Sequence, residues 1–344
     1  MAIQVDKNSA IMSSKLIFIT GATGFIGAAT ANAALKVGYR IRVSVRKDSQ
    51  ISKLKGIFSE YNDKIEFVIV PDITAPNAFS NVLDGVDYIL HLASPIAGSI
   101  KKEEMFPPAL EGTLSILRSA KEVGSIKKVV ITSSSLALEP LDGVPEGGVI
   151  REENGWDLSV NTNDNFDTGN DMFTSFKLYA ASKLVANNAS WEFVEKEKPG
   201  FELFTIHPSL VYGHNLIQQS AKEMEGSSNG LLFGSIISGA FKDSALFSVY
   251  IGDVANAHIK CLDDSVTKGT KYLVSGTPYT WKDIVEILEK DYPGVPHKLD
   301  KESKPILKNA DTARVERELG IKWTAPEKMI KEVLDQQLAY YKRS

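Results

Sequence analysis

Short apolar runs alternate with longer amphipathic stretches between Lys15 and His207. The apolar runs are nearly continuous, which is typical of strands buried on both faces of a parallel sheet. The stretches between them resemble the helical crossovers that parallel strands require. The pattern therefore predicts an α/β fold with a doubly wound parallel sheet. Strands are expected at residues 16–20, 40–45, 65–70, 88–93, 128–133 and 203–208.

This alternation stops after about residue 208. The stretches 139–175 and 214–230 are rich in polar residues and glycine, and they predict long loops. Long loops inside compact domains are often functional, so both are candidates for the walls of a substrate cleft. The alternative is a solvated excursion without ligand contact. Residues 250–262 predict a helix that returns to the main body.

The sequence TGATGFIGAAT at residues 20–30 directly follows the first expected strand and opens a helix. Glycines at this spacing allow a tight turn, a close approach to a pyrophosphate and close packing of the helix on the sheet. The helix N-terminus then faces the anion. We expect a dinucleotide here rather than a purely structural turn. The expected contacts are Gly21, Thr23, Gly24, Phe25, Ile26 and Gly27.

The end of the second expected strand, SVRKDS, indicates which dinucleotide is bound. An acidic residue there would bind the ribose 2′-hydroxyl of NAD, whereas an arginine can bind the 2′-phosphate of NADP. Arg46 lies at the strand end, with Lys47 beside it and Lys53 further on. Asp48 argues for NAD but comes two positions later, among positive charges. The prediction is therefore NADPH/NADP.

A hydroxyl, a phenol and an ammonium group are candidates for the chemistry. The sequence TSSSLA ends the fifth expected strand, and YAASK places Tyr179 and Lys183 one helical turn apart. A nearby ammonium favours the phenolate, so Lys183 is expected to lower the pKa of Tyr179. Tyr179 could then protonate a carbonyl oxygen that accepts a hydride, while a serine donates a second hydrogen bond.

Composition excludes several other classes of function. Among 344 residues, 43% are hydrophobic and 24% are charged, and the net charge of −4 comes without a basic tract. Neither nucleic acid nor an anionic membrane is therefore an expected partner. The apolar stretch at 230–241 is too short to span a bilayer. A cytoplasmic protein, monomeric or homodimeric, that acts on a small molecule is expected.

Metal and hydrolase chemistry have little support in the sequence. The five histidines have no metal-ligand spacing, so no metal site is expected. The one G-x-S-x-G match, GSSNG at 226–230, lies in an expected loop rather than between a strand and a helix, so it does not support a hydrolase. The single cysteine, Cys261, cannot form an internal disulfide and is expected to be a buried small hydrophobe.

Several stretches together resemble one known family across residues 15–340. They are TGATGFIG, VPDIT, HLASP, VVITSSS, YAASK, SWEF, YIGDVANAH and LGIKW. They are similar to those of the extended short-chain dehydrogenase/reductases, with a Rossmann-type sheet, and within them to the dihydroflavonol-reductase-like branch. The greatest similarity is to fungal NADPH-dependent aldehyde and ketone reductases.

The resemblance implies roles for individual residues. Ser134 takes the position of the catalytic serine, with Ser133 as the neighbour that could be confused with it, beside Tyr179 as acid/base and Lys183 as its partner. The cofactor contacts that the resemblance implies are Asp72 and Ile73 at the adenine, Ala93 and Pro95 near the nicotinamide ribose, and the backbone around His207 and Ser209 near the nicotinamide. Many relatives have an asparagine where this chain has Glu111, so no catalytic asparagine is expected.

The expected domains follow from these assignments. Residues 15–213 and 249–265 would form the NADP-binding domain, with 139–175 as a loop insertion near the cleft. A smaller, mostly C-terminal substrate-binding lobe would comprise 214–248 and 266–344, and 1–14 would be an N-terminal extension.

Three functions fit these assignments. The first is NADPH-dependent reduction of a carbonyl substrate, possibly an α-keto ester or aryl ketone, to an alcohol. The second is a nucleotide-sugar epimerase or dehydratase, and the third is a non-catalytic NADP-sensing protein. The apolar stretch 230–241 favours a large, apolar substrate. Two roles are equally open for the aromatic residues of the irregular stretches, an apolar substrate wall or core packing. These residues are Trp156, Phe166, Phe173 and Phe233.

Overall fold

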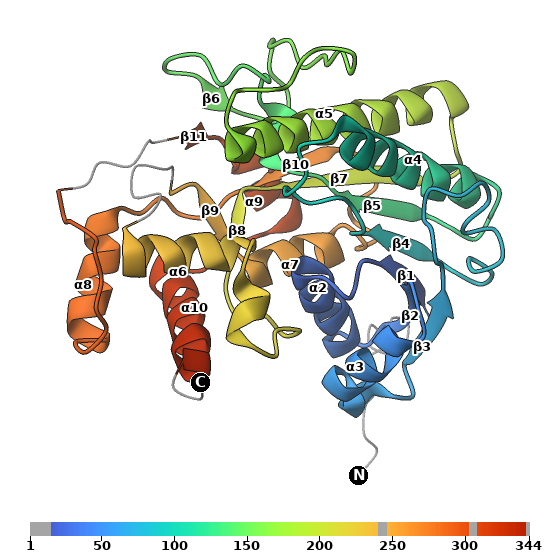
Figure 1. The fold of residues 1–344 in the computed structure, drawn as a ribbon. Helices are drawn as coiled ribbons and strands as arrows, with labels where there is room; N and C mark the ends of the chain where they lie inside the picture. Colours follow the sequence, from blue (N-terminus) through green and yellow to red (C-terminus); the bar gives the residue numbers. More distant parts are fainter. Residues whose placement is uncertain (1–14, 240–245, 303–307, 342–344) are drawn as a thin grey trace.

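The computed structural model describes residues 15–239, 246–302 and 308–341. Its centre is a parallel seven-stranded sheet with the order β10-β7-β5-β4-β1-β2-β3 (Figure 1). The doubly wound sheet is confirmed. The chain reverses its direction across the sheet between β1 and β4, where sheets of this kind leave a crevice for a ligand. The strands are β1 (Leu16–Thr20), β2 (Arg40–Val45), β3 (Ile65–Ile69), β4 (Tyr88–His91), β5 (Lys128–Thr132), β7 (Glu202–Pro208) and β10 (Lys271–Val274).

Six of these strands match the expected ones, but β10 was not expected. Only four residues long, it follows a polar loop and therefore gives little sequence pattern. It pairs with β7 and comes from the stretch assigned to the substrate lobe. The expected boundary must therefore be corrected so that 271–274 belongs to the sheet. The expected extension at 1–14 lies outside the described residues.

Helices cover both faces of the sheet (Figure 1). Residues of β1 alternate between two cores, because Ile17 and Ile19 pack on one face and Leu16 and Phe18 on the other. Alternation of this kind explains why strands buried on both faces are continuously apolar. One face carries α2 (Phe25–Lys36), α3 (Ser49–Ile57) and α7 (Ile251–Lys260), and the other carries α4 (Lys102–Lys121) and α5 (Asp171–Glu197).

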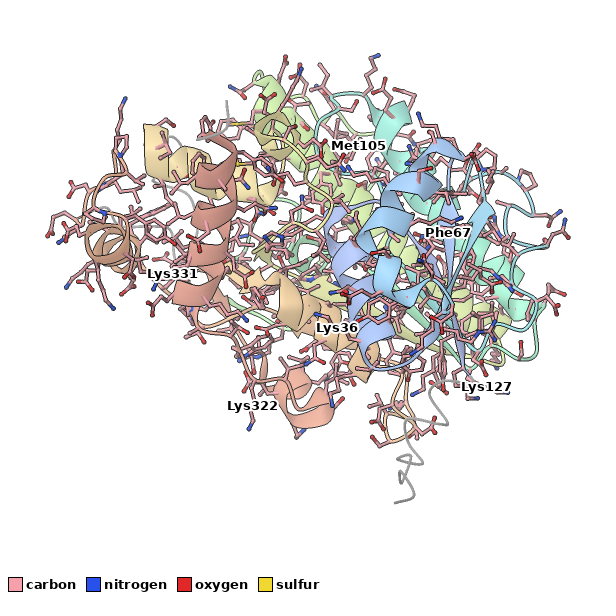
Figure 2. All side chains as sticks on the ribbon, turned by 90° about the horizontal axis from the view of Figure 1, so that it is seen from below. Lys36, Phe67, Met105, Lys127, Lys322 and Lys331 are labelled. Carbon is pink, nitrogen blue, oxygen red and sulfur yellow. The ribbon has the colours of Figure 1, made fainter. Side chains whose placement is uncertain are left out.

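A second hydrophobic core lies beside the sheet. It is built from α6 (Ser228–Ser238), α8 (Trp281–Asp291) and α10 (Pro326–Tyr341), with buried side chains such as Trp281, Ile284 and Ile330. In Figure 2 this lobe, with Lys331 on α10, lies to one side of the helical layer in which α2 ends at Lys36. Shorter elements complete the chain: η1 (Ser59–Tyr61), η2 (Ser135–Leu138), β6 (Val149–Ile150), β8 (Leu210–Tyr212), η3 (Ala221–Met224), β9 (Ser248–Tyr250), β11 (Asn309–Ala310) and α9 (Ala313–Leu319).

The irregular stretches differ in part from expectation. Residues 139–170 form loops apart from β6, but α5 already begins at Asp171, inside the expected loop. The Asn170 side chain accepts hydrogen bonds from the Met172 and Phe173 amides, at 3.0 and 3.2 Å, and so starts the helix early. The helix expected at 250–262 is confirmed as α7.

Two surveys of the described ranges bear on other possible functions. No helix there combines the length and the apolar character needed to cross a bilayer. No group of three or more His, Cys, Asp or Glu side chains there could hold a metal ion.

Candidate active site

The turn between β1 and α2 approaches its neighbours so closely that only glycine fits. Gly21 has φ of +75°, and a Cβ there would lie 2.6 Å from the backbone nitrogen of Ala93. A Cβ at Gly27 would lie 2.0 Å from the carbonyl oxygen of Gly21. Gly24 is the N-cap residue of α2 and has no side chain to accept a hydrogen bond from the first turn. The backbone amides of that turn are therefore available to an anion. The turn therefore fits the pyrophosphate cradle expected from the sequence.

Thr20 joins this turn to the end of β4. Its hydroxyl oxygen accepts hydrogen bonds from the amides of Leu92 and Ala93, each at 3.1 Å, and lies 3.0 Å from Nδ1 of His91. With both amides donating, the hydroxyl must donate to His91, whose Nε2 is buried and has no protein partner. Burial lowers the pKa of His91 to about 3, so the ring is neutral. The bonds fix the chain just before Pro95.

Tyr179 and Lys183 lie on one face of α5, as their spacing predicts. The Lys183 Nζ lies 5.5 Å from the centroid of the Tyr179 ring and donates a hydrogen bond to the Ser94 hydroxyl at 2.8 Å. Lys183 is 6% exposed, and none of the described carboxylates pairs with it. Burial lowers the pKa of Lys183 to about 8.

The expected lowering of the Tyr179 pKa is wrong for the chain without ligands. Burial raises the pKa of Tyr179, and a hydrogen bond with the Ser134 side chain opposes that shift without overcoming it. Desolvation disfavours the phenolate more than this bond favours it. Tyr179 is therefore a protonated phenol at neutral pH.

Ser134 rather than Ser133 contacts Tyr179. The Ser134 side chain forms the hydrogen bond with Tyr179 and also accepts one from the Leu136 amide at 3.3 Å. The amide of Ser133 instead donates to the Ile206 carbonyl at 2.7 Å, which ties that residue to β7. Successive residues of an extended chain point in opposite directions, so only one of the two serines can face α5.

A chain of hydrogen bonds holds Ser134 from behind. Since a carbonyl can only accept, Nδ1 of His207 donates to the Ser134 carbonyl at 3.0 Å. Its Nε2 then accepts from the Thr205 hydroxyl at 2.8 Å, and that hydroxyl accepts from the Trp191 indole at 3.3 Å. Burial lowers the pKa of His207 to about 3, so the ring is neutral and each donor is assigned. His207 is thus a positioning group for Ser134.

Basic residues lie at the end of β2 and on the helix α3 that follows it. Arg46 is exposed at the end of β2, and Lys53 lies on α3. The Asp72 carboxylate accepts hydrogen bonds from Thr74, and these bonds, aided by the charge of Arg46, lower the pKa of Asp72. The side chain of Ile73 packs beside Gly112 on α4. Most of the cofactor residues predicted from the sequence thus follow the carboxyl ends of β1 to β4, while His207 and Ser209 lie at the end of β7. The buried Ser209 hydroxyl there has no protein partner.

Residues 17–275 match the NAD dependent epimerase/dehydratase family. The chain belongs to this family. A ketoreductase of Aspergillus fumigatus, sphI, is 45% identical over 332 residues, which cover 96% of this chain and 99% of the relative. These findings confirm the family-level resemblance to the extended short-chain dehydrogenase/reductases.

Two further relatives of this epimerase/dehydratase family member are reductases by name. A putative NADPH-dependent methylglyoxal reductase of Candida albicans, GRP2, is 28% identical over 84% of this chain and 86% of the relative. The crystal structure of yeast methylglyoxal/isovaleraldehyde reductase Gre2, complexed with NADPH, superposes with a TM-score of 0.77. It is 25% identical and covers 96% of this chain and 100% of that chain.

The four aromatics considered for a substrate wall do not gather in this family member. Phe166 is buried against Phe106, Phe233 is buried in the lobe core, and Trp156 belongs to a third cluster. Only Phe173 is exposed, at 59%. Of the two alternatives for these aromatics, core packing therefore holds for three of the four, which lie in separate cores.

Exposed apolar side chains gather instead at the start of α5. Of eight exposed large hydrophobic side chains in the described residues, five come from two segments that follow β4 or open α5. The two segments are joined by a hydrogen bond of 2.7 Å from the Gly98 amide to the Ser175 hydroxyl. We call this the apolar rim; its members are Ile96, Ile100, Met172, Phe173 and Phe176.

Several supporting contacts were not predicted from the sequence. They are those of Ser94 with Lys183, of Thr20 with the end of β4, and of Thr205 with His207 and Trp191. Ser94 and Trp191 lie in the quoted motifs HLASP and SWEF, which were the only indication of them. Their contacts join residues 89 and 14 positions apart, respectively, and cannot be inferred from spacing alone.

Replacing Lys183 by an uncharged residue tests whether its buried ammonium group lowers the free energy of unfolding. Since 1 pKa unit is about 1.4 kcal/mol, the lowered pKa of Lys183 corresponds to about 3 kcal/mol. We expect Lys183→Met to raise the free energy of unfolding by about 1 to 3 kcal/mol at neutral pH. The folded pKa lies below the unfolded one, so this gain should be complete below pH 8 and disappear as pH rises toward 10.5.

Urea unfolding at several pH values provides this measurement. Lys177→Met is the matched control, because Lys177 is a less buried lysine on the same helix, and it should cause little change at any pH. A loss of stability in Lys183→Met that is independent of pH would contradict the assignment.

Proposed function

We propose that the protein reduces aldehydes or ketones to alcohols with NADPH, and that Tyr179 is the proton donor. The observation that supports this most strongly is the meeting of Tyr179 with Ser134 and Lys183 beside the β1–β4 crevice. Three groups suited to a developing alkoxide come from β5 and α5, close to where a dinucleotide would bind. The names of GRP2 and Gre2 support NADPH as the cofactor.

The site fits a bound dinucleotide on structural grounds. The Gly21 and Gly27 contacts leave no room for a Cβ, and the Ser209 hydroxyl and His91 Nε2 are buried polar atoms without protein partners. The glycine turn would hold the pyrophosphate, Arg46 and Lys53 the 2′-phosphate, and Ala93 and Ser209 would line the nicotinamide end. When bound, NADPH supplies the hydride for the substrate carbon.

The protonation states of Tyr179 and Lys183 indicate which group donates the proton to the carbonyl oxygen. Burial keeps the Tyr179 phenol protonated, which is the form needed to donate a proton to a carbonyl oxygen. The Ser134 hydroxyl donates a second hydrogen bond to that oxygen as negative charge grows on it. Lys183, protonated below a pKa of about 8, stabilises the phenolate that remains after transfer.

The apolar rim supports an apolar substrate. Exposed apolar groups gain free energy when a ligand removes them from water, at about 25 cal/mol per Å². Phe176 lies one helical turn before Tyr179, so a carbonyl at the phenol could have its apolar substituent on the rim. Residues 230–239, the described part of the apolar stretch 230–241, offer no comparable support, because Leu232, Phe233 and Ile236 are buried in the lobe core. We propose that the lobe, without β10, completes the substrate side.

One alternative is favoured by the family description, which includes epimerases and dehydratases. Arg46 at the end of β2 argues against it, because such enzymes usually retain NAD. Assays with a panel of aldehydes, ketones and UDP-sugars, each with NADPH or NADH, distinguish a carbonyl reductase from an epimerase or dehydratase. Absorbance of the reduced nicotinamide should fall with a carbonyl compound and NADPH.

Removing the phenol hydroxyl should abolish turnover but not binding. We expect Tyr179→Phe to lower kcat by about a hundredfold or more, since general acid catalysis contributes that much. NADPH binding, followed by fluorescence titration, should be nearly unchanged. Ser134→Ala should lower kcat by about a hundredfold, and Ser133→Ala is its matched control. Retained turnover in Tyr179→Phe would place the proton donor elsewhere.

Removing the guanidinium at the end of β2 should affect one dinucleotide only. We expect Arg46→Ala to raise the KM for NADPH about tenfold or more, since a hydrogen bond between charged groups is worth about 1.5 to 3 kcal/mol. The KM for NADH should hardly change. Arg40→Ala, at the opposite, exposed end of the same strand, is the control. Equal effects of Arg46→Ala on both cofactors would overturn the 2′-phosphate assignment.

A further inference from the structure

The segment after β8 is fixed to the C-terminal helix by paired amides. The backbone N–H of Asn215 donates to Oε1 of Gln336 at 2.9 Å, and Nε2 of Gln336 donates to the backbone carbonyl of Asn215 at 2.9 Å. Gln218 and Gln337 exchange two side-chain hydrogen bonds, at 2.8 and 3.0 Å. Gln336 and Gln337 are almost fully buried on α10. The start of this segment is therefore held rigidly against the lobe.

The other end of the segment reaches the nucleotide-binding half of the chain. Glu223 on η3 lies 3.5 Å from the Lys53 Nζ on α3, across 170 positions of sequence. The same carboxylate oxygen accepts the Gln219 amide at 3.1 Å, which orients it. Figure 1 shows the yellow segment after β8 passing between α10 and α2. Its residues Leu216 and Ile217 pack on the same core cluster as α2.

Lys53 is therefore paired with an acid of the lobe side, although it is a proposed ligand of the 2′-phosphate. We propose that Glu223 competes with the 2′-phosphate of NADPH for Lys53, and that it thereby sets how strongly the enzyme prefers NADPH. This inference rests on the proposed function, in which Lys53 and Arg46 bind that phosphate. NADH has no such phosphate and leaves the pair between Lys53 and Glu223 intact.

The energies make this exchange feasible. The pair is partly exposed, with side-chain exposures of 35% and 43%, and exposed ion pairs are weak. A phosphate monoester has about −1.5 to −2 charge and three acceptor oxygens, more than a carboxylate offers. NADPH can therefore displace Glu223, but each binding event loses the carboxylate contact. Glu223 also returns to Lys53 when the nucleotide leaves, which favours release.

Removing this competitor should strengthen NADPH binding. We expect Glu223→Gln to lower the Kd for NADPH roughly two- to fivefold, the range that an exposed ion pair contributes, and to leave the Kd for NADH unchanged. Glutamine can still accept the Gln219 amide, so the turn is retained. Glu225→Gln is the matched control, because it removes the same charge from an exposed position two residues away. Fluorescence titration of the full chain at low ionic strength gives both Kd values.

A double variant separates this inference from the proposed function. Lys53→Met should weaken NADPH binding, and in that background Glu223→Gln should have no further effect. If Lys53→Met leaves the Kd for NADPH unchanged, Lys53 does not bind the 2′-phosphate and the competition is overturned with it, whereas the assignment of Arg46 is tested by Arg46→Ala. If Lys53→Met weakens NADPH binding but Glu223→Gln does not strengthen it, or Glu225→Gln strengthens it equally, only the competition is overturned.

Discussion

The buried ammonium of Lys183 is the constraint on which the site depends. A charge this deep loses hydration, and among the described residues the Ser94 hydroxyl and the face of the Tyr179 ring compensate for that loss. The arrangement costs stability, and such costs persist in proteins where function requires them. It places a positive charge where a phenol can lose its proton. The same burial keeps that phenol protonated, which is the form that the proposed proton transfer needs.

The sheet topology brings the other groups to this charge. Because β1 and β4 adjoin at the switch point, the glycine turn and the HLASP segment meet, and Thr20 ties them together. Next to them, Ser134 follows the end of β5, and β7 supplies His207 behind it. The serine is thus held through its own backbone carbonyl. Ser134, Tyr179 and Lys183 therefore already lie together in this structure, which is the preorganisation that the proposed function requires.

Local patterns predicted the parts of this site that depend on spacing. The glycine spacing predicted the turn, the continuous apolar runs predicted six strands, and the positions of Tyr179 and Lys183 predicted a shared helix face. The failures concern burial and partners. The direction of the Tyr179 pKa shift depends on desolvation by the whole fold, and Phe166 and Phe233 belong to cores that assemble from distant segments. The pair between Lys53 and Glu223 is likewise a tertiary contact that neither local sequence contains.

A crystal structure of the protein with NADP and a ketone or alcohol bound would show how the substrate meets these groups. We expect the substrate oxygen within about 2.6 to 3.2 Å of both the Tyr179 hydroxyl and the Ser134 hydroxyl. We also expect the apolar substituent of the substrate on the apolar rim. A substrate oxygen bound away from both hydroxyls, with the phenol still facing the crevice, would contradict the account.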